Sequence, residues 1–253
     1  YDYPSAEYVK KFCSSTLDDY RKFVTYQKEH NGTVPECFQV GSRKQFTLLN
    51  DPKSYNKDFE VWNVAGNLQA PLPVNGKVVK RYTEYINDIG ENALSCAVLI
   101  RYGGFSYFNG GDLGGSPADE RDMESYVADL IGPVTVIKAN HHGYYDTCNG
   151  FFLNTLSPEV VVIDARSNNH PVPSTMTRMT DPLVWPDMGE FYITVDKARE
   201  KLSEELWAHF KPWGHIVVRV YEGGKQYQVF VLDPDKLDYP VKYISEIKTA
   251  GVK

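Results

Sequence analysis

The chain lacks the features of membrane proteins and of dedicated nucleic-acid binders. No apolar run approaches the roughly 20 residues that a helix needs to cross a bilayer, and the first residues do not resemble a signal peptide. Lys and Arg form no dense cluster, and the formal net charge is −6. We therefore expect no membrane segment and no evident nucleic-acid-binding surface. Neither the compartment nor the oligomeric state follows from the sequence.

Several catalytic motifs are also missing. The four cysteines are widely spaced and form no C-x-x-C, which argues against a thiolate zinc site or a disulfide-rich scaffold. No glycine-rich loop continues as G-K-[ST], no G-x-G-x-x-G opens a helix, and neither G-x-S-x-G nor H-E-x-x-H occurs. These absences exclude the most common nucleotide-binding loops, the nucleophile elbow of esterases and the helical zinc-protease motif.

What the chain does contain is a series of short apolar runs alternating with helical patterns. The patterns predict one or two helices over residues 5–29 with a stop at Asn31-Gly32, and a helix after Asp112 with Ser116 as cap, Pro117 at its first position and Gly132 at its end. They also predict a loop at 66–76, a helix over 196–210 and strands at 46–49, 59–64, 96–100, 105–108, 134–137, 160–163, 215–220 and 227–231, the last two as a hairpin. The order indicates an α/β fold, and the even composition favours a single domain over residues 1–253.

Three of the apolar runs stop at polar segments. The segments read NGGD at 109–112, NHHG at 140–143 and NNHP at 168–171. In α/β sheets, ligand sites gather at strand ends, so the three segments are candidates for one site.

Each candidate residue also has an ordinary structural explanation. Asp112 follows two glycines and could bind a cation, or it could turn the chain or cap a backbone amide. His141 and His142 are adjacent, so in extended backbone they would point to opposite faces and only one could enter a given site. Imidazole and carboxylate together suit Zn²⁺, Mn²⁺ or Fe. His170, next to Asn169 and before Pro171, could bind substrate, donate a proton or cap its loop.

These segments together resemble the metallo-β-lactamase-fold hydrolases. Within that family the chain is most similar to the branch with the hydrolase domain of the bacterial DNA-uptake competence channel and the phosphorylcholine esterases. The resemblance rests on the ordered runs NALS at 92–95, GGD at 110–112, IKANHHG at 137–143 and NHP at 169–171. It implies a metallo-β-lactamase-like αββα sandwich and a site with two divalent metal ions, zinc being favoured over manganese or iron.

The resemblance also implies roles for individual residues. Asp112 would bridge the two ions and take part in catalysis, and His141 would be a metal ligand. His142 is the competing ligand candidate and otherwise a substrate-binding residue. Asn169 and His170 would face the substrate, with His170 also catalytic.

The family's first metal cluster, H-x-H-x-D-H, does not occur among the six histidines of this chain. We therefore expect the sequence to be the C-terminal part of a complete domain, with N-terminal strands missing. Two ligands alone hold a zinc centre poorly, so the chain by itself is expected to bind metal weakly and to be inactive.

Three functional hypotheses follow. The first is a metal-dependent hydrolase of phosphodiester-type bonds, acting on a small-molecule or phosphodiester substrate through a metal-activated water. The second is a catalytically inactive binding or structural module of the same fold. The third is a carboxylic-ester or lactone hydrolase that uses the same site.

Overall fold

The computed structural model describes residues 15–55, 57–80, 91–116 and 122–251. The chain forms two compact units, residues 1–39 and residues 40–253. In the first unit, helix α2 (Ser15–Asn31) stops before Gly32, as predicted from Asn31-Gly32. The ring of His30 in its last turn stacks on Tyr26 with 4.1 Å between centroids.

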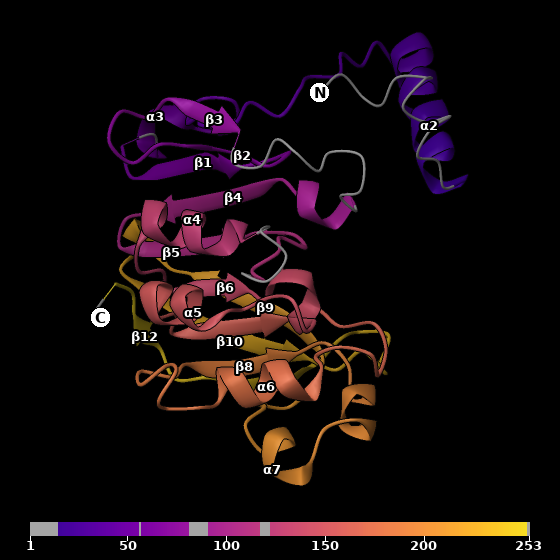
Figure 1. The fold of residues 1–253 in the computed structure, drawn as a ribbon. Helices are drawn as coiled ribbons and strands as arrows, with labels where there is room; N and C mark the ends of the chain where they lie inside the picture. Colours follow the sequence, from indigo (N-terminus) through magenta and orange to yellow (C-terminus); the bar gives the residue numbers. More distant parts are fainter. Residues whose placement is uncertain (1–14, 56, 81–90, 117–121, 252–253) are drawn as a thin grey trace. The chain divides into compact units, whose positions relative to one another are not determined.

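The second unit is built on a six-stranded mixed sheet, seen in Figure 1. Its strand order is β1-β4-β5-β6-β7-β8; β1, β4 and β5 pair antiparallel, whereas β5 to β8 pair parallel. The strands are β1 (Phe59–Ala65), β4 (Ala97–Tyr102), β5 (Phe105–Asn109), β6 (Val136–Lys138), β7 (Val160–Ile163) and β8 (Glu190–Ile193). The α/β class predicted from the sequence is therefore confirmed.

A second sheet is centred on β10 (Gln226–Leu232). One side of β10 pairs with β9 (His215–Val220), with Tyr227 opposite Val220, which confirms the predicted hairpin. Its other side pairs with β11 (Val241–Ile244) and β12 (Lys248–Thr249). A separate small ribbon joins β2 (Gln69–Pro71) to β3 (Val78–Lys80).

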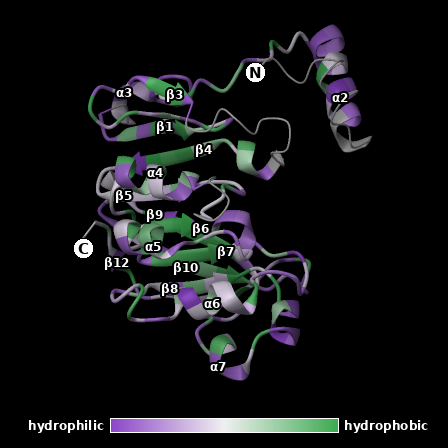
Figure 2. Ribbon diagram, viewed as in Figure 1, coloured by the Kyte–Doolittle hydropathy of each residue, from purple (hydrophilic) through white to green (hydrophobic). Residues whose placement is uncertain are grey.

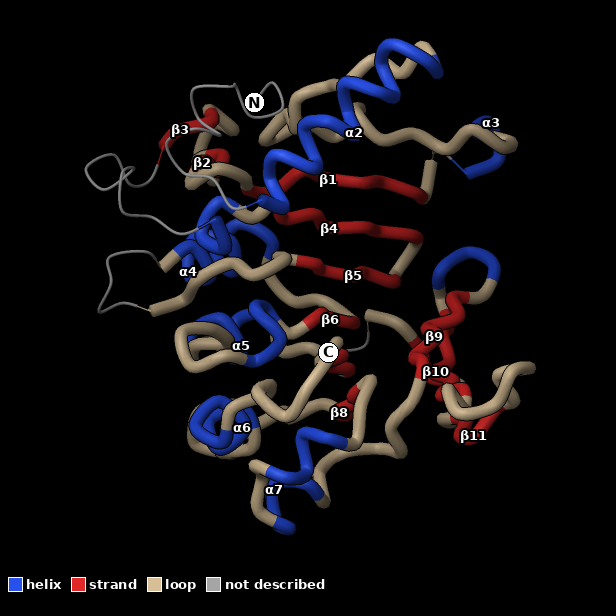
Figure 3. The backbone as a smooth tube through the Cα atoms, turned by 90° about the vertical axis from the view of Figure 1, so that its right-hand side faces the viewer, coloured by secondary structure: helices blue, strands red, loops and turns tan. Residues whose placement is uncertain are grey.

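The main sheet separates two layers, and Figure 3 shows them on its opposite sides. On one side lie α4 (Met123–Ile131), α5 (Gly150–Leu156) and α6 (Pro173–Met179), which bury one face of the sheet. On the other side Val136, Val160 and Tyr192 pack against Val229 and Val231 of β10. Strands β4, β6, β7 and β10 are accordingly mostly green, the hydrophobic end of the scale, in Figure 2. Burial of each such side chain contributes about 1.5–3 kcal/mol, so both layers hold the sheet in place.

The remaining elements are short. They are α3 (Pro52–Tyr55), η1 (Glu91–Leu94), η3 (Asn140–Gly143), η4 (Lys197–Glu200), α7 (Glu204–Trp207) and η5 (Glu222–Gly224). Among the described residues, no helix is both long and apolar enough to cross a membrane.

Several predicted boundaries are wrong for local reasons. Residues 46–49 form no strand, and Leu49 is 91% exposed. Helix α4 begins at Met123, where Asp122 caps it by accepting from the Ser125 amide, whereas Pro117, the predicted first position, lies outside the described residues. Its end at Gly132 is confirmed.

Two further predictions differ from the structure. The helix predicted over 196–210 is interrupted, because the Ser203 side chain accepts from the Leu206 amide and starts a new helix there. The segment 66–76, predicted as a loop, contains β2. Strand β8 and helix α6 were not predicted.

Glycines join the two sheets where their backbones meet. The β4–β5 turn at Gly103 touches the turn at Gly223-Gly224: a Cβ on Gly224 would lie 1.7 Å from the Tyr102 carbonyl oxygen. Gly224 also has a φ of +64°, which favours glycine. Gly223 has a φ of +78°, but no atom lies within 4 Å of the position of its Cβ.

This contrast gives a prediction for stability. Gly223→Ala should cost about 1–2 kcal/mol, the usual cost of the left-handed conformation. Gly224→Ala should cost at least about 1 kcal/mol more, because its methyl group also collides with backbone. Urea unfolding of both variants measures the difference, and equal losses would show that the close approach of the two turns is unimportant.

Candidate functional site

The three polar segments meet at one edge of the main sheet. Asp112 follows β5, the His141-His142 pair follows β6, and His170 lies in the loop that follows β7. These three strands are parallel neighbours, so their carboxyl ends lie together. The ring centroids of His141, His142 and His170 are 5.5–6.4 Å apart.

The backbone before Asp112 is held tightly. Gly111 has a φ of +62°, its amide donates to Asn109, and its carbonyl accepts from the Lys138 ammonium at 2.8 Å. The Asp112 amide donates to the Ser95 hydroxyl at 3.0 Å. A side chain at Gly110 would collide with Asn140, since its Cβ would lie 2.2 Å from the amide oxygen. The carboxylate of Asp112 therefore projects from a fixed turn.

The two adjacent histidines do not lie in extended backbone, which is the condition under which their side chains would point to opposite faces. Instead, His141 and His142 have φ values of 44° and 56° in the left-handed region. Each such residue costs about 1–2 kcal/mol, which the surrounding contacts must offset. The His141 amide donates to the Gly111 carbonyl at 3.1 Å, and the Thr147 hydroxyl donates to the Asn140 carbonyl at 2.9 Å. Both rings consequently reach the same site.

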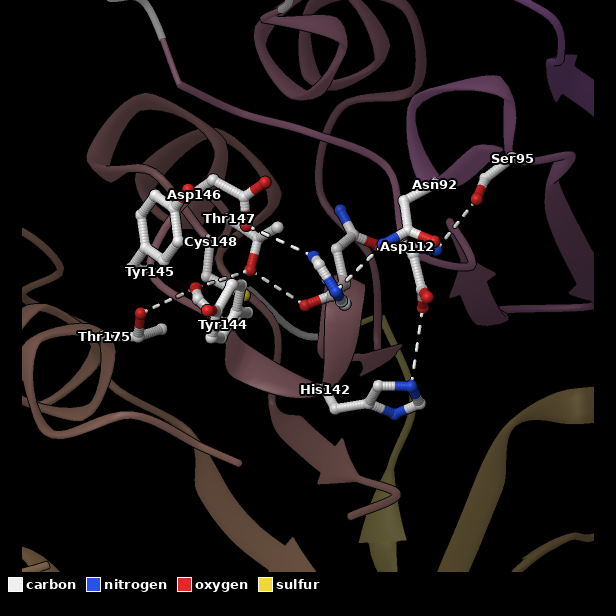
Figure 4. A network of polar contacts seen from close by, with 12 residues as sticks. Asn92, Ser95, Asp112, His142, Tyr144, Tyr145, Asp146, Thr147, Cys148 and Thr175 are labelled. Atoms are coloured by element: carbon white, nitrogen blue, oxygen red, sulfur yellow. Dashed lines mark hydrogen bonds and ion pairs between the residues drawn. The ribbon is translucent and has the colours of Figure 1, made fainter. Parts of the chain in front are cut away.

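Each of the two rings has a carboxylate at one nitrogen. Nδ1 of His141 lies 3.2 Å from Oδ1 of Asp146, and Nδ1 of His142 lies 3.0 Å from Oδ1 of Asp164. The opposite nitrogens meet different groups: Nε2 of His141 lies 3.1 Å from the Asn92 amide nitrogen, and Nε2 of His142 lies 3.6 Å from Oδ1 of Asp112. Figure 4 shows His142 and Asp112 facing each other.

The His142–Asp164 pair is electrostatically coupled. The hydrogen bond to Asp164 raises the pKa of His142, against the effect of burial and of the nearby Lys138. Burial opposes ionisation of Asp164, but the hydrogen bond to His142 and the charge of Lys138 outweigh it and lower its pKa. Asp164 is therefore ionised near neutral pH, and an ionised carboxylate only accepts hydrogen bonds. The proton shared by this pair thus belongs to Nδ1 of His142.

The ammonium group of Lys138 lies within the site. Its side chain is only 11% exposed, and its ammonium donates to the Gly111 and Ala139 carbonyls. The same ammonium lies 3.8 Å from Asp112 and 3.5 Å from Asp164. It therefore partly neutralises both carboxylates.

Glu124 accepts hydrogen bonds from both ends of the loop that carries the two histidines. This fully buried residue of α4 accepts from the Asn140 side chain and from the amides of Cys148 and Asn149, all at 2.7–2.8 Å. Burial raises its pKa to about 7, although these hydrogen bonds favour the ionised form. Glu124 thus ties together the start and the end of the loop that carries both histidines.

An open cavity of about 640 Å³ lies beside the histidines. Asn92, His141, Tyr144, Asn168, Asn169, His170, Pro171, Val172, Pro173 and Lys201 line it. Of the three residues predicted to bind substrate, Asn169 and His170 are on its wall, whereas His142 is not among the described lining residues. Burial and the nearby His142 and His141 lower the pKa of His170, so its imidazole is neutral at neutral pH.

The two histidines of the loop contact different site residues. Asp112 contacts His142, the competing ligand candidate and otherwise a predicted substrate-binding residue. His141, the expected metal ligand, contacts Asn92 and Asp146.

Sequence reasoning missed Lys138, Asp146, Asp164 and Glu124 as parts of the site. The only signal was position: Asp164 directly follows β7, and Lys138 ends β6. Asp146 reaches His141 because of the conformation of its loop, and Glu124 reaches the loop because of the orientation of α4. No sequence motif indicates either contact.

Within the described residues, no three His, Cys, Asp or Glu side chains converge in a way that could hold a metal ion. A scan against protein-family models gave no match, and a search of curated proteins gave none either.

The pKa of His142 tests the described geometry. In protein treated with a chelator, an NMR titration should place this pKa above 6.5, and Asp164→Asn should lower it because the charged acceptor is lost. Asp146→Asn is the matched control, since Asp146 contacts His141 instead. Equal shifts in both variants, or none in either, would contradict the pairing.

Proposed function

We propose that this chain carries part of the active site of a metal-dependent hydrolase that cleaves phosphodiester-type bonds. The observation that carries the proposal is the contact between Nε2 of His142 and Oδ1 of Asp112 at 3.6 Å. The fold proposed with it is a metallo-β-lactamase-like sandwich. Two stacked sheets, with helices on the outer face of one of them, support that fold.

The contact matters because both atoms are hydrogen-bond acceptors. With its proton on Nδ1, a neutral His142 presents a lone pair at Nε2 to the carboxylate of Asp112. Two acceptors face each other stably only when a cation lies between them. That cation is either a second proton on the ring or a metal ion.

The spacing fits a metal ion. Zinc bonds to nitrogen and oxygen are about 2.0–2.2 Å, so two ligand atoms on one tetrahedral ion lie roughly 3.4 Å apart. Histidine ligands of metals usually donate their other ring nitrogen to a carboxylate, as His142 and His141 do here. The donors also suit zinc, with manganese or iron as alternatives.

Residues Asp112 and His142 would hold one ion, and His141 with Asn92 would lie at a second. This assignment gives His142 the ligand role that the resemblance gave to His141, and it keeps His141 as a ligand of the second ion. A bound metal supplies a water of lowered pKa and polarises the bond to be cleaved. Zinc sites take three or more protein ligands, so the proposal requires donors beyond those in the described residues.

The remaining groups act on substrate directly. The neutral imidazole of His170 can accept a proton at one ring nitrogen or donate the N–H of the other as a hydrogen bond to a substrate oxygen, and Asn169 can donate a hydrogen bond to a phosphoryl oxygen. The ammonium of Lys138 lies 3.8 Å from Asp112 and 3.5 Å from Asp164 and attracts both carboxylates.

A second candidate is a catalytically inactive binding module. It is favoured by Lys138, whose ammonium already supplies one positive charge between the two carboxylates. A site neutralised in this way can persist without metal.

The test uses the longest natural form of the protein, with any residues encoded before Tyr1. We expect it to bind zinc or manganese and to hydrolyse bis(p-nitrophenyl) phosphate, and we expect Asp112→Asn and His142→Gln to reduce the rate by more than about 100-fold. This exceeds the 10–100-fold typical of residues that only support a metal ligand.

The control is His215→Gln, on β9 of the second sheet, which should keep full activity. Absence of bound metal together with absence of hydrolysis would favour the binding module. Preference for an aryl acetate or a lactone would replace phosphodiesters with carboxylic esters as the substrate class.

A further inference from the structure

The cavity beside the histidines is larger than one phosphate group requires. Its volume of about 640 Å³ falls within the range of sites for whole small molecules, about 300–1,000 Å³. Its lining includes Asn92 and His141, which belong to the proposed metal site, and also Lys201, which follows η4. A substrate that fills it must therefore extend well beyond the bond that is cleaved.

The charged side chain in the described lining of the cavity is positive. None of the residues that line the cavity in the described part of the chain is acidic, and Lys201 is its one permanently charged side chain. Lys201 forms no ion pair among the described residues, unlike Lys138, Lys211 and Lys248, each of which contacts a carboxylate. An exposed ammonium without an acidic partner attracts an anion.

Neutral polar groups continue the same surface. The side chains of Asn169 and His170 line the cavity and make no hydrogen bond within the described residues. The Asn168 amide is already engaged, since it donates to Glu200 at 2.6 Å, and this contact keeps the Glu200 carboxylate occupied. The lining groups without a partner among the described residues are thus two neutral side chains, Asn169 and His170, and one cation, Lys201.

We infer that the substrate carries a second anionic group, and that Lys201 selects for it. The inference rests on the hydrolase site proposed above and names its substrate class: a small phosphodiester with a further phosphate or carboxylate on the group that occupies the cavity. The ester to be cleaved lies at the histidines, and the second anion lies at Lys201. Tyr144, whose ring is 4.9 Å from His141 and 5.2 Å from His170, also lines the cavity.

The first test compares two substrates that share one reacting group. The p-nitrophenyl ester of thymidine 5′-phosphate has one negative charge, and the p-nitrophenyl ester of thymidine 3′,5′-bisphosphate adds an anion on the sugar. The second should have a KM about fivefold lower at low salt, with similar kcat, because an ion pair at 4 Å in water is worth about 1 kcal/mol. High salt should reduce the difference.

Variants identify the residue responsible. Lys201→Met should remove the preference by raising the KM for the bisphosphate ester alone. Lys197→Met, which removes a lysine four positions away that does not line the cavity, should keep the preference. If Lys201→Met keeps the preference, or if wild-type protein has none, the inference is wrong.

A binding measurement separates this inference from the proposed function. Calorimetry in the presence of a chelator should show thymidine 3′,5′-bisphosphate binding about fivefold more tightly than thymidine 5′-phosphate, and Lys201→Met should equalise them. A preserved preference in a protein without hydrolytic activity would refute the hydrolase and retain the anion site. Activity that depends on Asp112 without any preference would refute the anion site alone.

Discussion

The site depends on two carboxylate–imidazole contacts, Asp146 with His141 and Asp164 with His142. Each contact fixes the proton at Nδ1 and turns Nε2 of the ring towards the interior of the site. Without these carboxylates the rings could rotate or change tautomer, and Nε2 would lose its fixed direction. The contact with Asp112 and the proposed metal ligation both follow from this constraint.

The rigidity of the loop is supplied by the rest of the fold. Two successive left-handed residues are costly, and they persist because Glu124 holds the loop at Asn140 and Cys148 while the β5 turn accepts the His141 amide. The parallel register of β5, β6 and β7 places that turn, the loop and Asp164 at one edge. The second sheet and the helices hold those strands from both sides. The positions of the two histidines therefore depend on most of the second unit.

The sequence allowed the central strands to be predicted well, because runs such as Val160–Ile163 are short, β-branched and bounded by turn residues. It failed where a single side chain decides the local structure, as when Ser203 caps a new helix inside an amphipathic stretch. For the site, strand ends indicated Asp112, His170 and the histidine pair. The carboxylate partners of the histidines were not predicted, because in extended backbone only one of the two rings would enter the site. Asp146 and Asp164 become recognisable only once the left-handed conformation of that loop is known.

The tautomer of the two imidazoles tests the central claim most directly. Long-range proton–nitrogen NMR correlations on chelator-treated, ¹⁵N-labelled protein, recorded at a pH where both rings are neutral, distinguish a proton on Nδ1 from one on Nε2. The account predicts Nδ1–H for both His141 and His142, with Nε2 bare and facing Asn92 and Asp112. A proton on Nε2 of His142 would mean that this ring donates to Asp112 and needs no metal, which would contradict the account.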